Sequence, residues 1–537
     1  MQRRPAVLSA AVAALCFGIA SCATQDGGGA PGAHARLGKV NFPVGCNAEA
    51  QREFNVAMAY YYSFAWAQVR EPLERVLKAD PSCGMAHWLR TLAALDNPFG
   101  WPTVISAATL TDGGRFLDTA RSVGLKSQRE RDYVDALAVF FKGHDKLDHR
   151  SRAKAFEGAL ERVMQRYPED QEAAILYALV LSANFDPRDK KYTNQLKAAR
   201  ILEPIARQQP EHPGVAHYLI HSYDYPPIAA QGLDAARRYS KIAPDAAHAL
   251  HMPAHIFTRV GAWQDSIDSN RESVRVGGDK SFDKWHAYDY MVYAHLQLGQ
   301  DKAAREVVAE STGNPTRIDH GATAYAYSAM PARLALERGD WIAAANLPLF
   351  PAADAFPWKK YAFAEAINAY ARGLGAAMSG DTAAAGVQAA RLQTLRGATK
   401  VPYWVEEIEI QIGVVRGLAL CAGANRAACI EPLRAAAARE DATEKHVVTP
   451  GRLVPAREML AYAMLHAGNA AAALREFETV LERDPNRMRA FAGAARAAEA
   501  AGDKVKTAHY ASRLIDLTQR ADTPLADVAH FRRVTGR

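Results

Sequence analysis

Alanine is abundant along this chain, and the alternation of hydrophobic and polar residues that is typical of β-strands is scarce. This pattern predicts helices that pack closely through small residues. Near the C-terminus the pattern becomes an internal repeat, because Gly468 and Gly502 lie 34 residues apart. Ala473, Phe477 and Pro485 follow the first of these glycines. A glycine that ends one helix in a left-handed turn, an alanine where two helices approach and a proline that ends the second helix together predict a helical hairpin.

The 34-residue spacing resembles the tetratricopeptide repeat. Weaker copies lie nearer the N-terminus, at residues 50–83, 155–185 and 195–244, and further turn signatures begin at Gly261, Gly299 and Gly339. The resemblance implies an all-α, right-handed superhelical solenoid of tetratricopeptide-like helical hairpins with a concave inner face. We expect residues 39–350 to form its N-terminal part, with a histidine-rich groove within residues 213–300, and residues 351–537 to form the C-terminal repeats.

The N-terminal residues predict export and a lipid anchor. Two arginines precede an apolar run from Ala6 to Ala20 that is too short to span a membrane as a mature helix. The run ends in Ile19-Ala20-Ser21-Cys22, which resembles a bacterial lipobox, and an ordinary secretory signal with a chance cysteine is the alternative. We therefore expect a signal peptide at residues 1–21, lipidation of Cys22, a flexible tether at residues 22–38, and a protein anchored to the bacterial cell envelope, at the outer membrane, with its body in the periplasm.

The charge of the chain argues against nucleic acid as a partner. The formal net charge is +7, and it falls to +5 when Arg3 and Arg4 leave with the signal peptide. The basic residues are scattered and are not clustered with aromatic residues. Nucleic-acid binding is therefore not predicted.

Four cysteines follow Cys22 in the sequence: Cys46, Cys83, Cys421 and Cys429. The periplasm permits disulfides, and neither spacing is that of a zinc motif. Cys421 and Cys429 flank the turn Gly423-Ala424-Asn425, so a bridge between adjacent helices is reasonable, and Cys46 with Cys83 would connect the N-terminal extension to the first repeat. Buried thiols are the alternative.

Between residues 217 and 289, histidines and aspartates recur at the spacing of one helix face. Residues three or four apart on a helix are neighbours, so each of three sets should point one way. In tetratricopeptide repeats the first helix of each pair lines the concave groove, and counting back from the turns places the three sets on the groove-facing positions of consecutive helices. The candidate groove residues are His217, His221, Asp224, His248, His251, His255, Arg259, His286, Asp289 and Tyr293.

Several chemistries remain open for this groove. Neutral imidazole is the commonest metal ligand, and zinc, copper or nickel would accept sites rich in it. The candidate metal ligands are His217, His221, His248, His251 and His255. The groove could instead bind a peptide or small anion, or a histidine oriented by Asp224 or Asp289 could act as a general base. Hydrogen-bonded packing histidines are the structural alternative. No glutamate lies inside the histidine pairs, so the metalloprotease motif is absent.

Two strings, at residues 214–226 and 249–257, look like a family of bacterial tetratricopeptide-repeat proteins that are mostly exported or lipid-anchored. The resemblance covers most of residues 40–520 and implies a protein that binds other proteins, with no enzyme activity and no catalytic residue. We therefore interpret the chain as a membrane-anchored periplasmic scaffold that binds an envelope protein, a peptide or a small ligand in its groove. The alternative is a metal-binding protein or metallohydrolase that uses the histidines, with zinc or another transition metal as cofactor.

Overall fold

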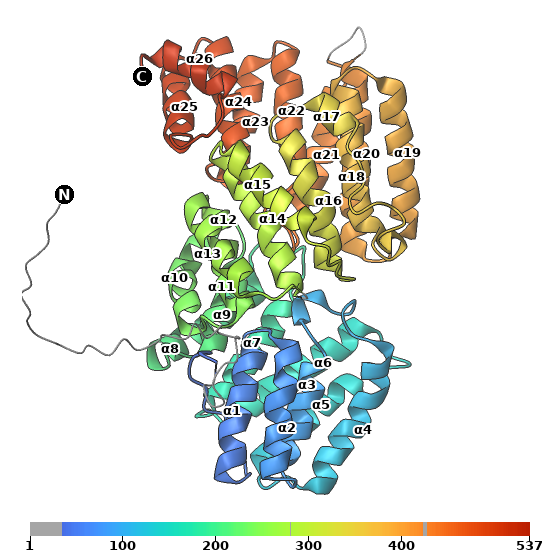
Figure 1. Ribbon diagram of the computed structural model, residues 1–537, viewed down its shortest axis with the longest axis vertical. Helices are drawn as coiled ribbons and strands as arrows, with labels where there is room; N and C mark the ends of the chain where they lie inside the picture. The colour runs from blue at the N-terminus through green and yellow to red at the C-terminus, as the bar shows by residue number, and fades with distance from the viewer. Residues whose placement is uncertain (1–34, 280, 423–426) are drawn as a thin grey trace, which may run out of the picture. The chain divides into compact units, whose positions relative to one another are not determined.

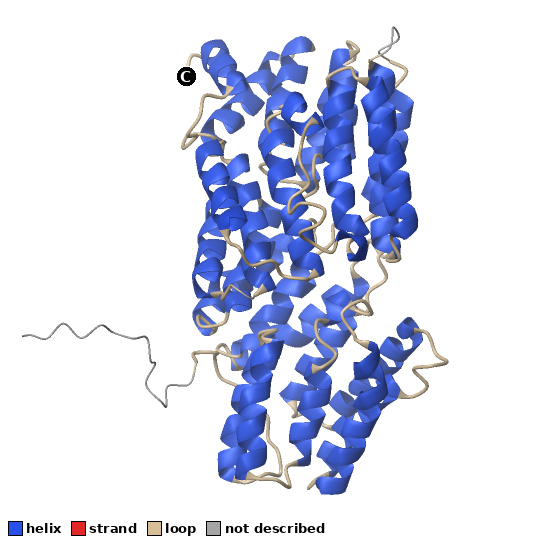
Figure 2. Ribbon diagram, turned by 45° about the vertical axis from the view of Figure 1, so that its right-hand side comes forward, coloured by secondary structure: helices blue, strands red, loops and turns tan. Residues whose placement is uncertain are grey.

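The computed structural model describes residues 35–279, 281–422 and 427–537, and these residues form helices and connecting loops without a β-strand (Figure 2). Residues 36–537 form one compact unit. The predicted signal peptide, Cys22, most of the tether and the turn at residues 423–425 lie outside the described residues. Within the described part of the chain, no helix combines the length and apolar character that a membrane crossing requires.

The first half of the unit is a run of antiparallel helices, in which each helix packs against its neighbour in the chain (Figure 1). Its helices are α1 (Ala48–Tyr62), η1 (Trp66–Val69), α2 (Arg70–Ala79), α3 (Gly84–Ala93), η2 (Pro98–Gly100), α4 (Ala107–Val123), α5 (Gln128–Phe141), α6 (His149–Arg166), α7 (Gln171–Ala183), α8 (Thr193–Gln208), α9 (Pro213–Tyr223), η3 (Ala229–Gly232) and α10 (Leu233–Ile242).

The second half continues the same arrangement (Figure 1). Its helices are α11 (Ala247–His251), α12 (Pro253–Val260), α13 (Trp263–Val276), α14 (Phe282–Gln297), α15 (Asp301–Gly313), α16 (Gly321–Leu336), α17 (Trp341–Ala345), η4 (Trp358–Lys360), α18 (Ala362–Met378), α19 (Thr382–Ala398), α20 (Pro402–Cys421), α21 (Ile430–Ala442), α22 (Ala456–His466), α23 (Ala470–Arg483), α24 (Met488–Ala500), α25 (Lys504–Leu517) and α26 (Ala526–Thr535).

The predicted turn glycines end the first helix of each hairpin. Gly261, Gly299 and Gly339 have φ angles of 70°, 73° and 64°, and Gly468 and Gly502 have φ angles of 84° and 74°. These values lie in the left-handed region that glycine enters without a steric penalty. The prediction of an all-α solenoid of tetratricopeptide-like hairpins is therefore confirmed.

A proline divides the helix that carries three of the histidines. α11 ends at His251 and α12 begins at Pro253, which has no backbone N–H to donate. The Met252 N–H still donates to the His248 carbonyl at 2.9 Å, so the two short helices follow one another closely. His248, His251 and His255 therefore keep nearly the spacing of one continuous helix.

The C-terminal repeats pack back onto the turns of the middle repeats. The Trp263 indole N–H donates to the Asn486 carbonyl at 2.9 Å, and the Asn486 amide donates to the Gly261 carbonyl at 3.2 Å. One turn further along, the N–H groups of Lys302 and Ala303 each donate to the Asp522 carboxylate at 3.0 Å. These contacts join residues more than 200 positions apart in the sequence.

Residues 443–454, between α21 and α22, pack against α14 and α16. The Tyr290 hydroxyl lies 3.3 Å from the carbonyl oxygens of both Val447 and Thr449. The Arg333 guanidinium donates to the Gly451 carbonyl at 3.0 Å. This segment, which we call the covering segment, lies over the helices that carry the candidate site.

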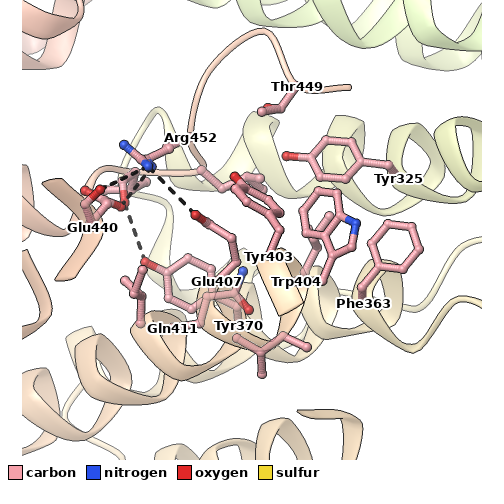
Figure 3. A pocket seen from close by; sticks show the side chains of 15 residues that line it. Tyr325, Phe363, Tyr370, Tyr403, Trp404, Glu407, Gln411, Glu440, Thr449 and Arg452 are labelled. Atoms are coloured by element: carbon pink, nitrogen blue, oxygen red, sulfur yellow. Dashed lines mark hydrogen bonds and ion pairs between the residues drawn. The ribbon is translucent and has the colours of Figure 1, made fainter. Parts of the chain in front are cut away.

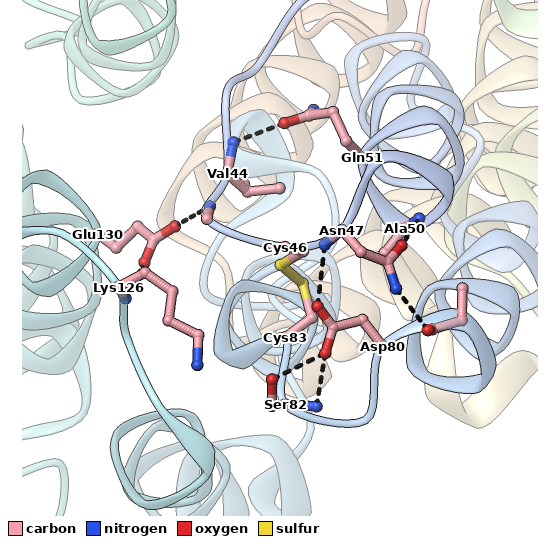
Figure 4. Close-up of a disulfide and its surroundings, with 12 residues drawn as sticks. Val44, Cys46, Asn47, Ala50, Gln51, Asp80, Ser82, Cys83, Lys126 and Glu130 are labelled. Atoms are coloured by element: carbon pink, nitrogen blue, oxygen red, sulfur yellow. Dashed lines mark hydrogen bonds between the residues drawn. A yellow bond between two sulfur atoms is a disulfide. The ribbon is translucent and has the colours of Figure 1, made fainter.

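Two disulfides are present in the structure. Cys46, just before α1, is bonded to Cys83, just before α3 (Figure 4). Beside it, the Asn47 side chain caps α1 by accepting from the Ala50 N–H at 2.9 Å. The second disulfide joins Cys421 and Cys429. Both pairs are those proposed from the sequence.

The compact unit begins at Arg36 and so includes the last residues of the predicted tether. The Arg36 guanidinium donates to Asp245 at 2.7 Å, and Leu37 is only 3% exposed. Gly38 has a φ of 83° and sits against the Glu211 carbonyl. Residues 36–38 therefore pack on the solenoid, because Leu37 has an apolar site to fill.

Candidate metal centre

Six buried histidines lie on α9, α11, α12 and α14, the helices coloured green to yellow-green in Figure 1, and their side chains come together. They form two sets, within each of which the potential ligand atoms lie within 4.8 Å of one another. The first set is His217, His221 and His248, and the second is His251, His255 and His286. None of the six is more than 8% exposed. The structure therefore brings the predicted histidines together, and it places them inside the protein.

In the first set, outer contacts hold two of the rings. His217 donates through Nδ1 to the Tyr62 carbonyl at 2.7 Å, because a carbonyl can only accept, and this leaves a lone pair on its Nε2. His248 Nδ1 lies 2.9 Å from the Asp283 carboxylate, and its Nε2 is buried without a protein partner. His221 Nε2 lies 3.1 Å from His217 Nε2. The Nε2 atoms of this set therefore face inward.

The second set is held in the same manner. His251 Nδ1 lies 2.6 Å from Asn270 Oδ1, and the Asn270 amide nitrogen donates to the Ser266 carbonyl at 2.7 Å, which leaves its oxygen facing the imidazole. His255 Nδ1 lies 2.9 Å from Asp224 Oδ2. Both Nδ1 atoms are thus donors, so both Nε2 atoms carry lone pairs. Metal-binding histidines are usually oriented by an acceptor of this kind behind the ring.

The two lone pairs of the second set point at one another. His251 Nε2 and His255 Nε2 are 3.0 Å apart with no proton available between two neutral rings. Such a contact is repulsive unless a cation lies between the nitrogens. Two nitrogens bound at about 2.05 Å to one tetrahedral ion would be about 3.3 Å apart. The observed separation is therefore close to that of two ligands on one metal ion.

Burial favours the neutral form of five of these imidazoles. It is the largest cause that lowers the pKa of His217, His221, His251 and His286 well below the ordinary value, and the neighbouring imidazoles add to the effect. Burial also lowers the pKa of His255, even though Asp224 opposes the change. Neutral imidazole is the form that binds metal ions.

Aromatic rings exclude water from the site. Phe99 stacks on His221 with ring centroids 4.1 Å apart, and Phe64 stacks on His248 at 5.4 Å. Tyr290 lies edge-on to His251 at 4.8 Å. Phe64 has a φ of 53°, a left-handed conformation that costs a bulky residue free energy, so its place over the histidines is maintained by the surrounding packing.

The acid behind His255 is held ionised by two cations. Burial opposes ionisation of Asp224, but Lys445 and Arg259 together lower its pKa well below the ordinary value. The Arg259 guanidinium donates to Asp224 at 2.8 Å, and the Lys445 ammonium lies 3.8 Å away. Burial lowers the pKa of Lys445 to about 7. The sequence placed Asp224 and Arg259 in this region, whereas Lys445 comes from the distant covering segment.

Two predicted groove residues belong to a different cluster. Asp289 forms an ion pair with Arg333, whose guanidinium donates to it at 2.8 Å. The Tyr293 hydroxyl accepts from Arg487 at 3.2 Å. Neither touches the histidines, because their helix positions face the ion pairs that join the middle repeats to the C-terminal repeats.

The expected open groove is not observed at the histidines. The covering segment, Phe64 and Phe99 close the face on which the histidines lie.

Some residues of the site were not identified from the sequence: the Tyr62 carbonyl, Phe64, Asn270, Asp283 and Lys445. Asp283 had a visible signal, because it lies three residues before His286 on the same helix. The others come from separate repeats or from a loop, and no local spacing connects them with the histidines.

No protein-family model matches this sequence, and no curated protein sequence is similar to it. Among solved structures, the Naa15/Naa10 complex bound to HypK-THB is 12% identical to this chain, with a TM-score of 0.25. The match covers 90% of this chain and 65% of the chain in that structure. Yeast Tom70 is 11% identical, with a TM-score of 0.30, and the match covers 91% of this chain and 88% of the Tom70 chain. The P58(IPK) TPR domain is 11% identical, with a TM-score of 0.19, and the match covers 85% of this chain and 99% of that domain. No functional conclusion follows from similarity at this level.

Proposed function

We propose that this protein binds transition-metal ions in a buried site made of six histidines, which an α-solenoid encloses. One observation carries the proposal: the lone pairs of His251 Nε2 and His255 Nε2 face one another at 3.0 Å while Asn270 and Asp224 hold the opposite ring nitrogens. Packing histidines would be expected to satisfy both ring nitrogens with donors and acceptors, and here they do not.

The ligand set limits which ions fit. Neutral imidazole suits copper, zinc, nickel and iron, and no thiolate or carboxylate belongs to either set of three. Calcium and magnesium prefer oxygen ligands and are disfavoured. Three histidines would hold one ion and leave a coordination position for a further ligand. We assign no catalytic residue.

The proposal extends to the cell envelope. Lipidation of Cys22 and a periplasmic location are supported by the N-terminal sequence, and the disulfides Cys46–Cys83 and Cys421–Cys429 suit an oxidising compartment. Labelling of cells with a fatty-acid probe tests the anchor: label should enter the wild-type chain and be lost in Cys22→Ala. Label that persists in the variant would exclude this anchor.

Metal analysis of the purified mature chain tests the site. After exposure to zinc or copper and removal of free ion, the wild-type protein should retain ion in stoichiometric amounts, and the double variant His251→Ala, His255→Ala should retain less ion than the wild-type protein. The control is His509→Ala, which changes an exposed histidine on α25 and should retain it. Circular dichroism verifies that the variants stay helical. Absence of bound ion from the folded wild-type protein, at neutral pH with metal supplied, would rule the function out.

Protein or peptide binding is a second candidate function, and a cavity elsewhere supports it. A cavity of about 390 Å³ lies between the C-terminal ends of α18, α20 and α22 and is lined by Met378, Leu418, Met459, Tyr462 and His466, among others. Methionine-rich apolar surfaces adapt to partner side chains. A photo-crosslinking residue at position 378 should capture a defined envelope protein if this cavity is a binding site. Capture equal to that of a probe at exposed position 505 on α25 would count against it.

A further inference from the structure

We propose that the site holds two metal ions, one in each set of three histidines, and that the two ions lie close enough to interact. This inference rests on the proposed metal-binding function and deepens it. Each set offers three imidazoles, and in each set two of the rings have a supporting acceptor behind Nδ1.

The solenoid repeats the same ligand arrangement twice. The first set combines an i,i+4 pair on α9, His217 and His221, with His248 from the next repeat. The second set combines the i,i+4 pair His251 and His255 with His286 from the repeat after that. Each ion would therefore lie at the junction of two neighbouring repeats.

The series of histidine sets does not continue at the third repeat junction, because other side chains occupy the equivalent positions. In the same helix register, the residues that would supply the next pair are Asp289 and Tyr293. Asp289 is bonded to Arg333, and Tyr293 packs against Arg333 and Arg487. The structure thus contains two ligand sets at successive junctions and an ion-pair cluster at the third.

The two sets adjoin one another. The ring centroids of His221 and His255 are 6.2 Å apart, and those of His248 and His251 are also 6.2 Å apart. Ions held in the two sets would therefore be close neighbours, as in protein sites that hold two metal ions.

Charge favours copper, in its monovalent state, as the occupant. Neither set of three contains a carboxylate, and Asp224 is paired with Arg259 and lies near Lys445. Asp283 is the remaining carboxylate in contact with a ring, and the described residues give it no lysine or arginine partner. Two divalent ions would bring four positive charges into this buried space, whereas two cuprous ions bring two, and uncompensated buried charge is costly.

Copper counting and electron paramagnetic resonance test the pair. Wild-type mature protein is incubated with cuprous ion under reducing, oxygen-free conditions, freed of excess copper, and then oxidised with ferricyanide. We expect two copper ions per chain and a cupric signal that accounts for much less than the total copper, because two nearby cupric ions couple. His248→Ala and His286→Ala remove equivalent ligands from the two sets, and each should retain one copper ion with a signal that accounts for all of it.

The possible outcomes separate the pair from the proposed function. One copper ion in wild type, lost in both variants, would overturn the pair while metal binding stands. Two ions with a full signal would show that the ions do not interact, which also overturns it. No retained copper or zinc would remove the proposed function itself. Preference for zinc in direct competition would overturn the assignment to copper. If an alanine variant loses its helical circular dichroism, His248→Asn and His286→Asn replace it, because asparagine fills similar space.

Discussion

At the scale of the residue, burial acts on ionisable groups in opposite directions according to their charge type. It favours the neutral form of five histidines of the candidate site, and it also makes buried carboxylates such as Glu440 harder to ionise. The spacing of histidines in the sequence was enough to locate His217, His251 and their helical neighbours. It failed for Asp289 and Tyr293, because Arg333 and Arg487, which bind them, lie far along the chain and have no periodic relation to them.

Glu440 shows the effect of burial on a carboxylate. It lies beside a cavity of about 30 Å³ with Glu407 and Arg452 (Figure 3). Its carboxylate accepts from the Ala456 N–H at 2.8 Å and lies 3.5 Å from the Arg452 guanidinium. Burial raises the pKa of Glu440 to about 7, because the attraction of Arg452 does not offset the loss of water and Glu407 adds repulsion.

A raised pKa means that the folded state holds the proton more tightly than the unfolded state does. The resulting stabilisation is complete below about pH 4.5 and is lost as the pH rises through about 7. We therefore predict that Glu440→Gln gains stability relative to wild type between pH 5 and pH 8, by on the order of 3 kcal/mol. Urea unfolding at several pH values measures this difference. A difference that is constant with pH would contradict the raised pKa.

Glu406→Gln is the matched control. Glu406 lies on α20 and accepts from Arg439, and this hydrogen bond lowers the pKa of Glu406. Its contribution to stability is present above about pH 4.5 and is lost as the pH falls. The difference between this variant and wild type should therefore change in the acidic range and with the opposite sign.

At the scale of the element, the turn glycines were the clearest signal in the sequence, because a left-handed turn restricts the choice of residue. The helices around them followed from the same repeat. The covering segment, residues 443–454, could not be predicted in this way. It has no periodicity, and its position depends on tertiary partners such as Tyr290 and Arg333.

Two turn glycines with similar left-handed φ angles should differ in how much stability the protein loses when each is replaced by alanine. At Gly468, with a φ of 84°, an added Cβ would meet nothing within 4 Å, so Gly468→Ala introduces backbone strain alone, about 1 kcal/mol. At Gly261, with a φ of 70°, the Cβ would lie 2.3 Å from the Pro485 carbonyl oxygen. We predict that Gly261→Ala destabilises the protein clearly more than Gly468→Ala does. Equal losses in thermal or urea unfolding would mean that the turn at Gly261 does not pack against the Pro485 loop.

At the scale of the whole molecule, buried ion pairs join repeats that are remote in sequence. Arg487, before α24, donates to Glu458 on α22 at 2.6 Å and to Glu337, after α16, at 3.0 Å. All three side chains are at most 2% exposed. Such a network need not add net stability compared with apolar residues, but removal of one partner leaves buried charge uncompensated.

Arg487→Met should therefore be among the most damaging substitutions, because it leaves two buried carboxylates without their shared cation. We predict a loss of about 3–5 kcal/mol in the free energy of unfolding. Arg434→Met removes a half-exposed arginine that pairs with Glu431 and Glu476, and it should cost about 1 kcal/mol or less. Urea unfolding compares the two variants. Similar losses would indicate that Arg487 is solvated and that the repeats do not close around it.

The covering segment also sets an order of events during biogenesis. The histidines belong to residues 217–286, whereas the residues that close over them belong to residues 443–454. A chain that is made and exported from its N-terminus therefore presents the six imidazoles to its surroundings well before it can enclose them. If the proposed site binds metal, an ion reaches the imidazoles most easily before the later repeats close over them, and the compartment in which the chain folds then influences which ion the protein carries.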